Sequence, residues 1–497
     1  MRRNTSYSLL RWVAIGFIIM AGFLATVELV RYSNMRSSFP IGMKIAGVPV
    51  GGMEYQSASE RLLTVFLSPI EIHYGDAAIQ VRPATLGFDL KLESMLAAAD
   101  RQRVNEPFWQ GFWKYLWNQP FTSQDVPLQA KFDDERIRLF LENEIAPRYD
   151  QPATPPMPVP GESSFYPGTP GTELVYDRAL LQIKDTLSSS ANRSVRLTYR
   201  RTNVPRAGID LVEIMIKDIV DASPFDGIVE VYLKDLKTFQ TVNFVYSKVY
   251  DEEIPVDIAY SSWSTIKIPV MVTAFRLLEE PYLEENLALI EKMVELSENN
   301  STDELGARVI EQALAPIIVT EDIQKLGLEN TFWAGFFAPG SPLLQRYKTP
   351  ANQRTDYVTE PDEYAQTTPA DMGYLLEDIY FCAERNGGSL IAAFGDQITQ
   401  NECKLMVQYL ALNKIGVLIQ AGVPGGTTVA HKHGWAYEVD DGYIHTIGDS
   451  SLIYTPGGDY ILSIFVHHPV QAVFDPVNVL MANISSAVYN YFNLQAQ

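Results

Sequence analysis

Ser264 and Lys267 most constrain how this chain can fold, because they place a hydroxyl and an amine at the start of an apolar segment. Residues three apart lie on the same face of a helix. An amine removed from water there loses its proton more easily and can act as a base toward the serine. The pair predicts a buried helix start that carries a nucleophile and its base. Alone it is weak evidence, because such pairs arise by chance in a chain of this length.

Two further motifs follow in order. Ser297-Glu298-Asn299 comes after a helical-looking segment, 271–296, and Lys432-His433-Gly434 leads into an apolar, strand-like C-terminal region. The order Ser-x-x-Lys, Ser-Asp-Asn, Lys-Thr-Gly is typical of class A β-lactamases and penicillin-binding proteins, and residues 222–497 resemble that family. Flanking segments that also resemble it are the strand-like 227–236, the helix start 367–376 and the strand 429–434.

The resemblance implies a role for each motif residue. Ser264 would be the nucleophile and Lys267 its general base, while the backbone N–H groups of Ser264 and Trp435 would stabilise the oxyanion. Ser297 would relay a proton to the leaving group, and Lys432 would tune Ser297 and hold the substrate carboxylate. The catalytic candidates are therefore Ser264, Lys267, Ser297 and Lys432, and the substrate-binding candidates are Asn299, His433, Gly434 and Trp435.

Three departures from the family pattern affect the predicted activity. Glu298 stands where the family has aspartate, and His433 stands where it usually has a hydroxyl residue. Imidazole can donate to a carboxylate, but its bulk and its titration near neutral pH would change substrate preference. Asn352, 17 residues before Pro369, stands where class A β-lactamases carry a deacylating glutamate. Without that base an acyl-enzyme formed with a β-lactam is expected to persist, which favours a peptidase or other acyl-transfer role.

The two serines also have a structural explanation. Ser264 could cap a helix beside a surface lysine, and Ser297 could cap a helix that begins at Asn299 or Asn300. The ordered motifs favour the catalytic explanation for both serines.

Three histidines raise the alternative of a zinc site. His431 and His433 face the same side of a predicted strand, and His445 on a neighbouring strand could complete three ligands. No His-x-x-x-His or carboxylate spacing supports such a site. We therefore expect no metal, and the resemblance implies no cofactor.

The predicted fold class is α+β. Strand patterns at both ends of the hydrolase-like region (227–235, 241–247, 442–448, 450–454 and 460–466), with helical patterns between them, predict a β-lactamase-like domain in which an antiparallel sheet packs against a helical cluster. A chain of 497 residues is too long for one core. The predicted organisation is residues 1–36 as a cytoplasmic tip and transmembrane anchor, 37–208 as a smaller membrane-proximal α+β module, and 222–497 as the serine hydrolase domain.

Residues 37–208 resemble the peptidoglycan-binding-like module of vancomycin-resistance W-type proteins. The glycine turn 47–53, a helix expected to be capped at Ser57, and Leu86-Gly87-Phe88 correspond to its first half, and 165–200 to its second. These residues are structural rather than chemical, so glycan binding is a weak expectation. The Pro/Gly-rich segment 151–171 is predicted to be an exposed connection within this module.

The N-terminus predicts a membrane anchor. An uncharged apolar run, 12–27, follows three arginines, and residues 9–30 supply the roughly 20 residues that a spanning helix needs. Basic residues before the run favour a cytoplasmic N-terminus with the later domains outside the membrane. A cleaved signal peptide is the alternative, but no Ala-x-Ala site follows the run.

Charge and cysteine content limit the partners. The net charge is 39 − 60 = −21, which disfavours nucleic acid because phosphate binding needs a basic surface. Cys382 and Cys403, 21 residues apart in helical-looking segments, are either a disulfide in an oxidising compartment or two buried thiols. The sequence gives no oligomeric state.

The leading hypothesis is a membrane-anchored extracytoplasmic serine hydrolase that acts on cell-wall peptide or a related amide or ester through an acyl-serine. The peptidoglycan substrate is implied by the resemblance. A catalytically impaired member that binds wall fragments or a protein partner is the alternative, and a true β-lactamase is a third.

Overall fold

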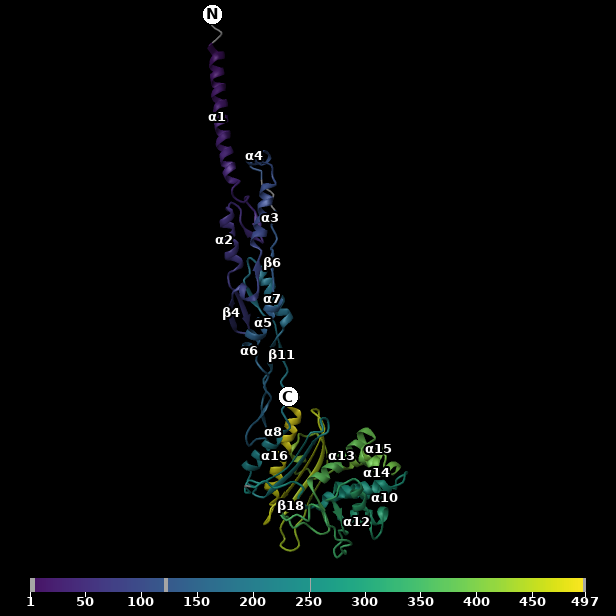
Figure 1. The fold of residues 1–497 in the computed structure, drawn as a ribbon. Coiled ribbons are helices and arrows are strands. Elements are labelled where there is room, and N and C mark those ends of the chain that lie inside the picture. Colours follow the sequence, from purple (N-terminus) through teal and green to yellow (C-terminus); the bar gives the residue numbers. More distant parts are fainter. Residues whose placement is uncertain (1–4, 120–123, 251, 495–497) are drawn as a thin grey trace. The chain divides into compact units, whose positions relative to one another are not determined.

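The computed structural model describes residues 5–119, 124–250 and 252–494. They form two compact units (Figure 1): one contains the residues up to Thr154 and Thr169–Val204, and the other contains Pro155–Gly168 and the residues from Pro205 onward. The segment Pro155–Gly168 groups with the second unit because Asn490 donates to the Ser163 carbonyl at 2.6 Å.

The first unit consists of short strands and helices. Its elements are α1 (Thr5–Met35), β1 (Lys44–Ile45), β2 (Val48–Pro49), α2 (Tyr55–Phe66), β3 (Ile70–Tyr74), β4 (Ala77–Val81), η1 (Pro83–Leu86), β5 (Asp89–Leu90), α3 (Leu92–Val104), α4 (Phe108–Leu116), β6 (Ala130–Lys131), α5 (Asp134–Phe140), η2 (Leu141–Ile145), α6 (Ala146–Tyr149), β9 (Gly171–Leu174), α7 (Tyr176–Ser188), β10 (Ser194–Arg196) and β11 (Tyr199–Thr202).

One apolar core holds these elements together. Strands β3, β4 and β10 form a sheet in which β10 runs parallel to β3, and buried residues of α2, α3, α5 and α7 complete the core. Helix α2 follows Glu54 and has no side-chain cap. The prediction that Ser57 caps this helix is therefore wrong. The resemblance to a peptidoglycan-binding-like module stays a prediction.

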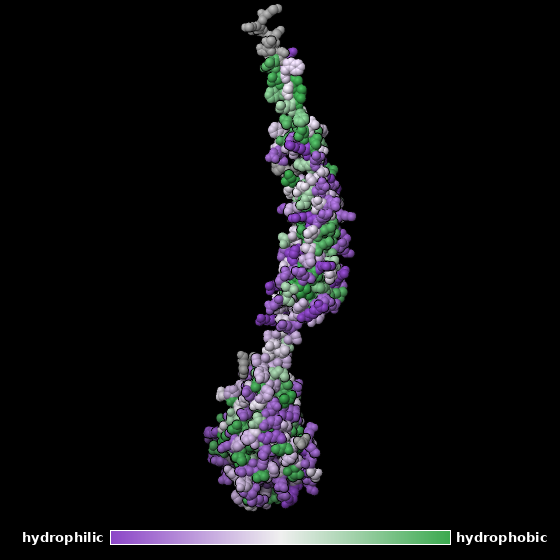
Figure 2. Space-filling view, turned by 90° about the vertical axis from the view of Figure 1, so that its left-hand side faces the viewer, coloured by the Kyte–Doolittle hydropathy of each residue, from purple (hydrophilic) through white to green (hydrophobic). Residues whose placement is uncertain are grey.

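Helix α1 contains the apolar N-terminal run. Among the described residues, it is the one helix long and apolar enough to cross a membrane: Leu9–Met35 contains an 18-residue window with a mean hydropathy of 2.3, and none of that window is buried. Figure 2 shows predominantly hydrophobic surface along this helix. A membrane span and a signal sequence both fit these properties.

The second unit is larger and is built around a five-stranded sheet. Its elements are β7 (Met157–Pro158), β8 (Phe165–Tyr166), α8 (Asp210–Ala222), β12 (Ile228–Asp235), β13 (Thr241–Tyr246), β14 (Tyr260–Ser261), η3 (Trp263–Ile266), α9 (Lys267–Leu277), α10 (Glu284–Glu295), α11 (Asn299–Leu305), η4 (Gly306–Ile310), α12 (Ala315–Lys325), β15 (Phe332–Trp333), β16 (Ala365–Thr367), α13 (Pro369–Arg385), α14 (Ser389–Phe394), η5 (Gly395–Gln397), α15 (Gln400–Ala411), η6 (Gln420–Gly422), β17 (Thr428–Trp435), β18 (Thr446–Tyr454), β19 (Tyr460–His467) and α16 (Phe474–Asn493).

The sheet is antiparallel with the order β13-β12-β19-β18-β17, so strands from both ends of the unit lie side by side. Helices α8 and α16 cover one face, and α13 leads the helical cluster on the other (Figure 1). Because both faces are covered, β12 is buried at seven of its eight residues. Gly373 lets α13 approach β12, since a Cβ there would lie 2.3 Å from the Tyr232 ring.

Two sequence expectations about element boundaries are wrong. The segment 271–296 is two helices, α9 and α10, separated by residues 278–283. Pro281 lies in this break and has no backbone N–H to continue a helix. The strands expected at 442–448 and 450–454 are one strand, β18, which begins at Thr446.

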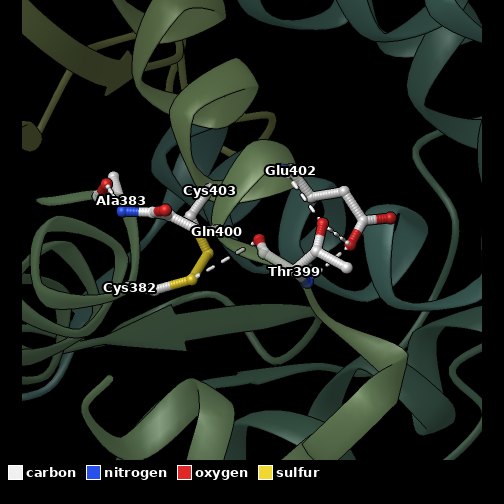
Figure 3. Close-up of a disulfide and its surroundings, with 6 residues drawn as sticks. All are labelled: Cys382, Ala383, Thr399, Gln400, Glu402 and Cys403. Carbon is white, nitrogen blue, oxygen red and sulfur yellow. Dashed lines mark hydrogen bonds between the residues drawn. A yellow bond between two sulfur atoms is a disulfide. The ribbon is translucent and has the colours of Figure 1, made fainter. Parts of the chain in front are cut away.

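Cys382 of α13 and Cys403 of α15 form a disulfide (Figure 3), which decides between the two alternatives left open by the sequence. The connection between the helices is held by further contacts. Gln400 donates to the Ala383 carbonyl at 2.9 Å, and Thr399 forms a capping box with Glu402 at the start of α15. The bridge fixes two helices of the cluster that packs on the sheet.

Replacing both cysteines (Cys382→Ala with Cys403→Ala) should lower the free energy of unfolding of the second unit by about 3 kcal/mol, because a bridge across 21 residues restricts the unfolded chain. Guanidinium unfolding of the oxidised protein and the variant measures the difference. A reductant should destabilise the parent protein and leave the variant unchanged. Equal unfolding midpoints for the oxidised parent and the variant would contradict the prediction.

Candidate active site

Ser264 and Lys267 meet at the junction of two helical segments. Ser264 lies in the 3-10 turn η3, and Lys267 is the first residue of α9. The Nζ atom of Lys267 lies 2.8 Å from Ser264 Oγ. Ser264 is half-buried, whereas Lys267 is fully buried and α9 is apolar on nearly every side. The alternative of a surface lysine is therefore wrong.

The partners of Lys267 suit a neutral amine. Its Nζ also lies 3.1 Å from the Ser297 carbonyl and 2.7 Å from Asn299 Oδ1, and both of these oxygens only accept hydrogen bonds. A neutral amine has two N–H donors for them and one lone pair for the Ser264 hydroxyl. Burial, with a smaller contribution from Lys432, holds the pKa of Lys267 well below its usual value. The geometry fits either protonation state, and burial favours the neutral amine.

Ser297 contacts both lysines. Its carbonyl faces Lys267, and its Oγ accepts a hydrogen bond from Lys432 Nζ at 2.9 Å. Its backbone has a φ of 61°, in the left-handed region that non-glycine residues seldom occupy. The N-cap of α11 is Glu298 rather than Ser297. Ser297 is therefore not a helix cap, and one unusual backbone conformation directs its two oxygens to different amines.

Lys432 is buried in β17 and donates to the His433 carbonyl at 3.0 Å as well as to Ser297. Burial lowers the pKa of Lys432 to about 7, and Asp449 opposes that shift. Lys432 therefore titrates near neutral pH.

Glu298 is the first departure from the family pattern. Its carboxylate accepts a hydrogen bond from the Ser301 hydroxyl, one turn along α11.

His433 points away from Lys432, as neighbouring residues of a strand do. Its ring is 2% exposed and stacks on Trp435 with centroids 4.7 Å apart, and Asn413 Nδ2 lies 3.2 Å from its Nδ1. Burial and the neighbouring Lys432 hold the pKa of His433 well below its usual value. The contact with a substrate carboxylate predicted for His433 stays a prediction, and the ring already has partners here.

The three histidines of the zinc alternative do not surround a common metal position. The rings of His431 and His433 stack, and His445 has other partners. His431 lies against Asp449 and Gln420, and His445 lies against Asp441 and the His468 carbonyl. In the described part of the chain, no group of three His, Cys, Asp or Glu side chains is arranged to hold a metal ion.

Gly434 permits a close contact between two backbone segments. A Cβ at this position would lie 2.7 Å from Ser264 N and 2.8 Å from Ser262 O. The close approach is thus between β17 and the backbone of the turn that carries Ser264. It brings the N–H group of Ser264 beside the strand that continues to Trp435, where the oxyanion donors are expected.

A cavity of about 440 Å³ opens at Ser264. Asn299 and Trp435 also line it, while Lys267 and Lys432 are buried behind this surface. The full lining is Trp263, Ser264, Asn299, Trp333, Gly335, Phe336, Phe337, Ala338, Pro339, Gly340, Ser341, Asp362, Tyr364, Ala365, Trp435, Ala436 and Val439.

Three residues of the cavity wall carry no motif and are missed by sequence reasoning. Phe337 places its ring centroid 4.7 Å from Lys267 Nζ, and Asp303 of α11 holds this loop by accepting from Phe337 N at 2.9 Å. Trp263, directly before Ser264, has a φ of 45°, which is unusual for a bulky residue. Asp362 supplies a carboxylate whose pKa is raised by burial.

Asn352 performs a structural task at the place of the absent glutamate. Its Nδ2 donates to the Tyr347 carbonyl at 3.1 Å and to Gln366 Oε1 at 2.9 Å. Both bonds hold the loop before β16. Its Oδ1 accepts from Thr349 N at 2.9 Å, and a neutral amide is too weak a base to activate water.

Comparisons with known proteins concern mainly the second unit. The model of the beta-lactamase enzyme family matches residues 285–492. Residues 285–492 are β-lactamase-like. The match includes Ser297 and Lys432 and begins after Ser264 and Lys267. It confirms the predicted fold class: a mixed α+β chain with a β-lactamase-like domain and an N-terminal apolar helix.

The solved structures that resemble this chain share low sequence identity with it. The chain is similar to PBP-A, with 19% identity over 59% of this chain and 100% of that chain and a TM-score of 0.40. It is similar to an ancestral (GNCA) class A β-lactamase, with 19% identity over 55% of this chain and 95% of that chain and a TM-score of 0.38. It is also similar to a class A β-lactamase from Mycobacterium abscessus, with 17% identity over 56% of this chain and 100% of that chain and a TM-score of 0.39. No curated protein matches the chain.

Gly434→Ala should reduce acylation of Ser264 by about 100-fold, the effect of losing one oxyanion donor. The added methyl group collides with backbone atoms of Ser262 and Ser264, so the turn must move. Gly425→Ala is the matched control, because a Cβ there meets nothing within 4 Å. Acylation rates of the two variants with a fluorescent penicillin measure the effect, and equal rates would refute it.

Proposed function

We propose that the second unit is a serine acyltransferase or hydrolase that cleaves an amide or ester through an acyl-serine at Ser264. The observation that carries this proposal is the 2.8 Å separation of Lys267 Nζ and Ser264 Oγ at a fully buried amine. Serine hydroxyls react only when a base accepts their proton. A neutral Lys267 with one lone pair toward the hydroxyl supplies that base.

The reaction begins when a substrate carbonyl enters the cavity at Ser264. The Oγ atom attacks the carbonyl carbon while its proton passes to Lys267 Nζ. The backbone N–H groups of Ser264 and Trp435 stabilise the oxyanion. The intermediate collapses to an acyl-serine as the departing amine or alcohol takes a proton from the Ser297 hydroxyl, and the Lys267 ammonium returns a proton to Ser297. Water or an acceptor amine then gives a proton to the neutral Lys267 and attacks the acyl carbon. As the acyl–oxygen bond breaks, Ser264 Oγ takes that proton back.

Lys432 has the second role. While protonated it donates to Ser297 Oγ and adds positive charge behind the cavity. That charge assists Ser297 as a proton donor and attracts a substrate carboxylate. Both effects depend on Lys432 retaining its proton.

Substrate and location belong to the same proposal. A cell-wall peptide that ends in a carboxylate suits the protonated Lys432 behind the cavity and Asn299 at its wall. Helix α1 would anchor the chain with both units outside the membrane, where such peptides occur. The structural role of Asn352 supports slow release of a β-lactam acyl group, which favours a peptidase-type enzyme over a β-lactamase.

A fluorescent penicillin tests the nucleophile. The parent protein should form a covalent adduct that survives denaturing electrophoresis and washing, and Ser264→Ala should abolish it. Ser341→Ala should keep it, because this serine lines the same cavity without contacting a base. Lys267→Met should slow labelling by 10²- to 10⁴-fold, the usual contribution of a general base.

Two other results would decide against an acyl-serine at Ser264, and a third would decide against the peptidase-type reaction. No labelling by penicillin or by an acyl-serine probe would favour the alternative of an impaired, binding-only protein, which the buried and stacked His433 also favours. Labelling retained in Ser264→Ala would show another nucleophile. Rapid hydrolysis of nitrocefin would favour a true β-lactamase.

The second-order rate of acylation should follow a bell-shaped pH profile. It rises with pH as Lys267 loses its proton, and falls as Lys432 loses its proton at about pH 7. Lys432→Arg should move the falling limb well above pH 9, because guanidinium stays protonated. Stopped-flow acylation between pH 5 and 10 measures both profiles. A falling limb that is unchanged in Lys432→Arg would exclude Lys432 as its source.

A further inference from the structure

Helix α4 exposes three tryptophans in the first unit. Trp109 is 63% exposed and Trp113 56%, and Trp117, directly after the helix, is 72% exposed. They are spaced at i, i+4 and i+8, so they follow one side of the helix. Leu116 is exposed with them. The chain has seven tryptophans, and three of them lie here.

The opposite side of α4 packs on α1. Tyr32 of α1 is 1% exposed and its ring lies against three aromatic rings of α4, with centroids 5.3 Å from Phe108, 5.5 Å from Phe112 and 5.4 Å from Tyr115. A Cβ at Gly111 would lie 2.1 Å from Tyr32 Oη, so glycine permits this close contact. The packing holds α4 at the C-terminal end of the apolar helix (Figure 1).

We propose that α4 lies in the membrane–water interface of the bilayer that α1 crosses, with Trp109, Trp113 and Trp117 inserted between the lipid headgroups. The inference rests on the membrane anchoring included in the proposed function. Tryptophan is enriched at this depth because its ring is apolar and its N–H is polar. Arg36 contacts Phe108 at the start of α4 and Glu28 contacts Tyr115 at its end, so α4 runs alongside α1 and its tryptophan side faces the interfacial layer around the anchor.

The position of α4 along α1 supports lipid as the occupant. The uncharged apolar run 12–27 ends directly before Glu28, and Tyr32 follows Arg31, so α4 is attached where the apolar run ends. Tyr115 donates to Glu28 Oε2 at 2.8 Å, which places a polar contact at the same level. Arg36 also lies here, 5.3 Å from the Phe108 ring centroid, whereas Arg103 in the cavity beside α1 is paired with Asp100. Anionic headgroups are attracted by a basic group such as Arg36.

The two attachments together would fix the first unit on the bilayer. A single spanning helix leaves a domain free to rotate about the helix axis. A second contact through α4 removes that freedom, because α4 is rigidly packed on α1.

The test uses the full chain in lipid vesicles with single labelled cysteines. Cys382 and Cys403, the two cysteines of the chain, form a disulfide, so an introduced cysteine is the only free thiol. Three exposed positions carry the environment-sensitive fluorophore NBD: Trp113→Cys on α4, Ile19→Cys on α1 and Leu181→Cys on α7. Lipids with a nitroxide in the headgroup or deep in the acyl chain quench the label according to its depth.

Residue 113 should be quenched most by the headgroup nitroxide, residue 19 by the deep nitroxide, and residue 181 by neither. Trp117→Cys, one turn from 113, should repeat the result of 113. If residue 19 is quenched while 113 and 117 behave like 181, the inference is wrong and the anchor stands. If residue 19 is not quenched either, the anchoring itself fails. A blue-shifted emission at 113 without quenching would mean that protein covers this side of α4, which also overturns the inference.

Discussion

The burial of the Lys267 amine is the constraint on which the rest of the site depends. An ammonium without water or a carboxylate partner is costly, and the cheapest response is loss of its proton. The surrounding core favours that loss, although Asp303 acts against it: α9 is buried from Lys267 through Phe275, and the Phe337 ring covers the amine from the cavity side. The same packing that stabilises the centre of the second unit therefore produces a base beside Ser264.

Ser297 lies between the two lysine amines of the site and contacts each of them with a different oxygen atom. Two ammonium groups near one serine repel each other, so only one is expected to keep its proton at neutral pH. The Ser297 carbonyl and Asn299 Oδ1 accept from the N–H groups of a neutral Lys267, and the Ser297 hydroxyl accepts from Lys432 Nζ. Asp449 favours the charged form of Lys432 alone. The different surroundings explain how two identical side chains can act as base and as cation.

The ordered motifs were enough to predict the fold class and the meeting of Ser264 with Lys267, because helix spacing relates those two residues directly. They did not predict how β17 meets the turn at Ser264: the requirement for Gly434 comes from backbone atoms of Ser262 and Ser264, far away in sequence. The cavity wall at Phe337 and Asp362 was missed for the same reason. Element boundaries failed where a local breaker, such as Pro281, acted against a continuous apolar pattern.

The departure at His433 matters less for chemistry than its sequence position suggests. In β17 the alternation of side chains puts Lys432 and Gly434 toward Ser264, while His431, His433 and Trp435 form a stack of rings on the other side. Asn413 and the stack occupy the His433 ring, and burial keeps it neutral. A charged imidazole beside Lys432 would have raised the cost of protonating that lysine. The neutral ring leaves Lys432 as the cation nearest to Ser297, which is the arrangement that the proposed proton transfer requires.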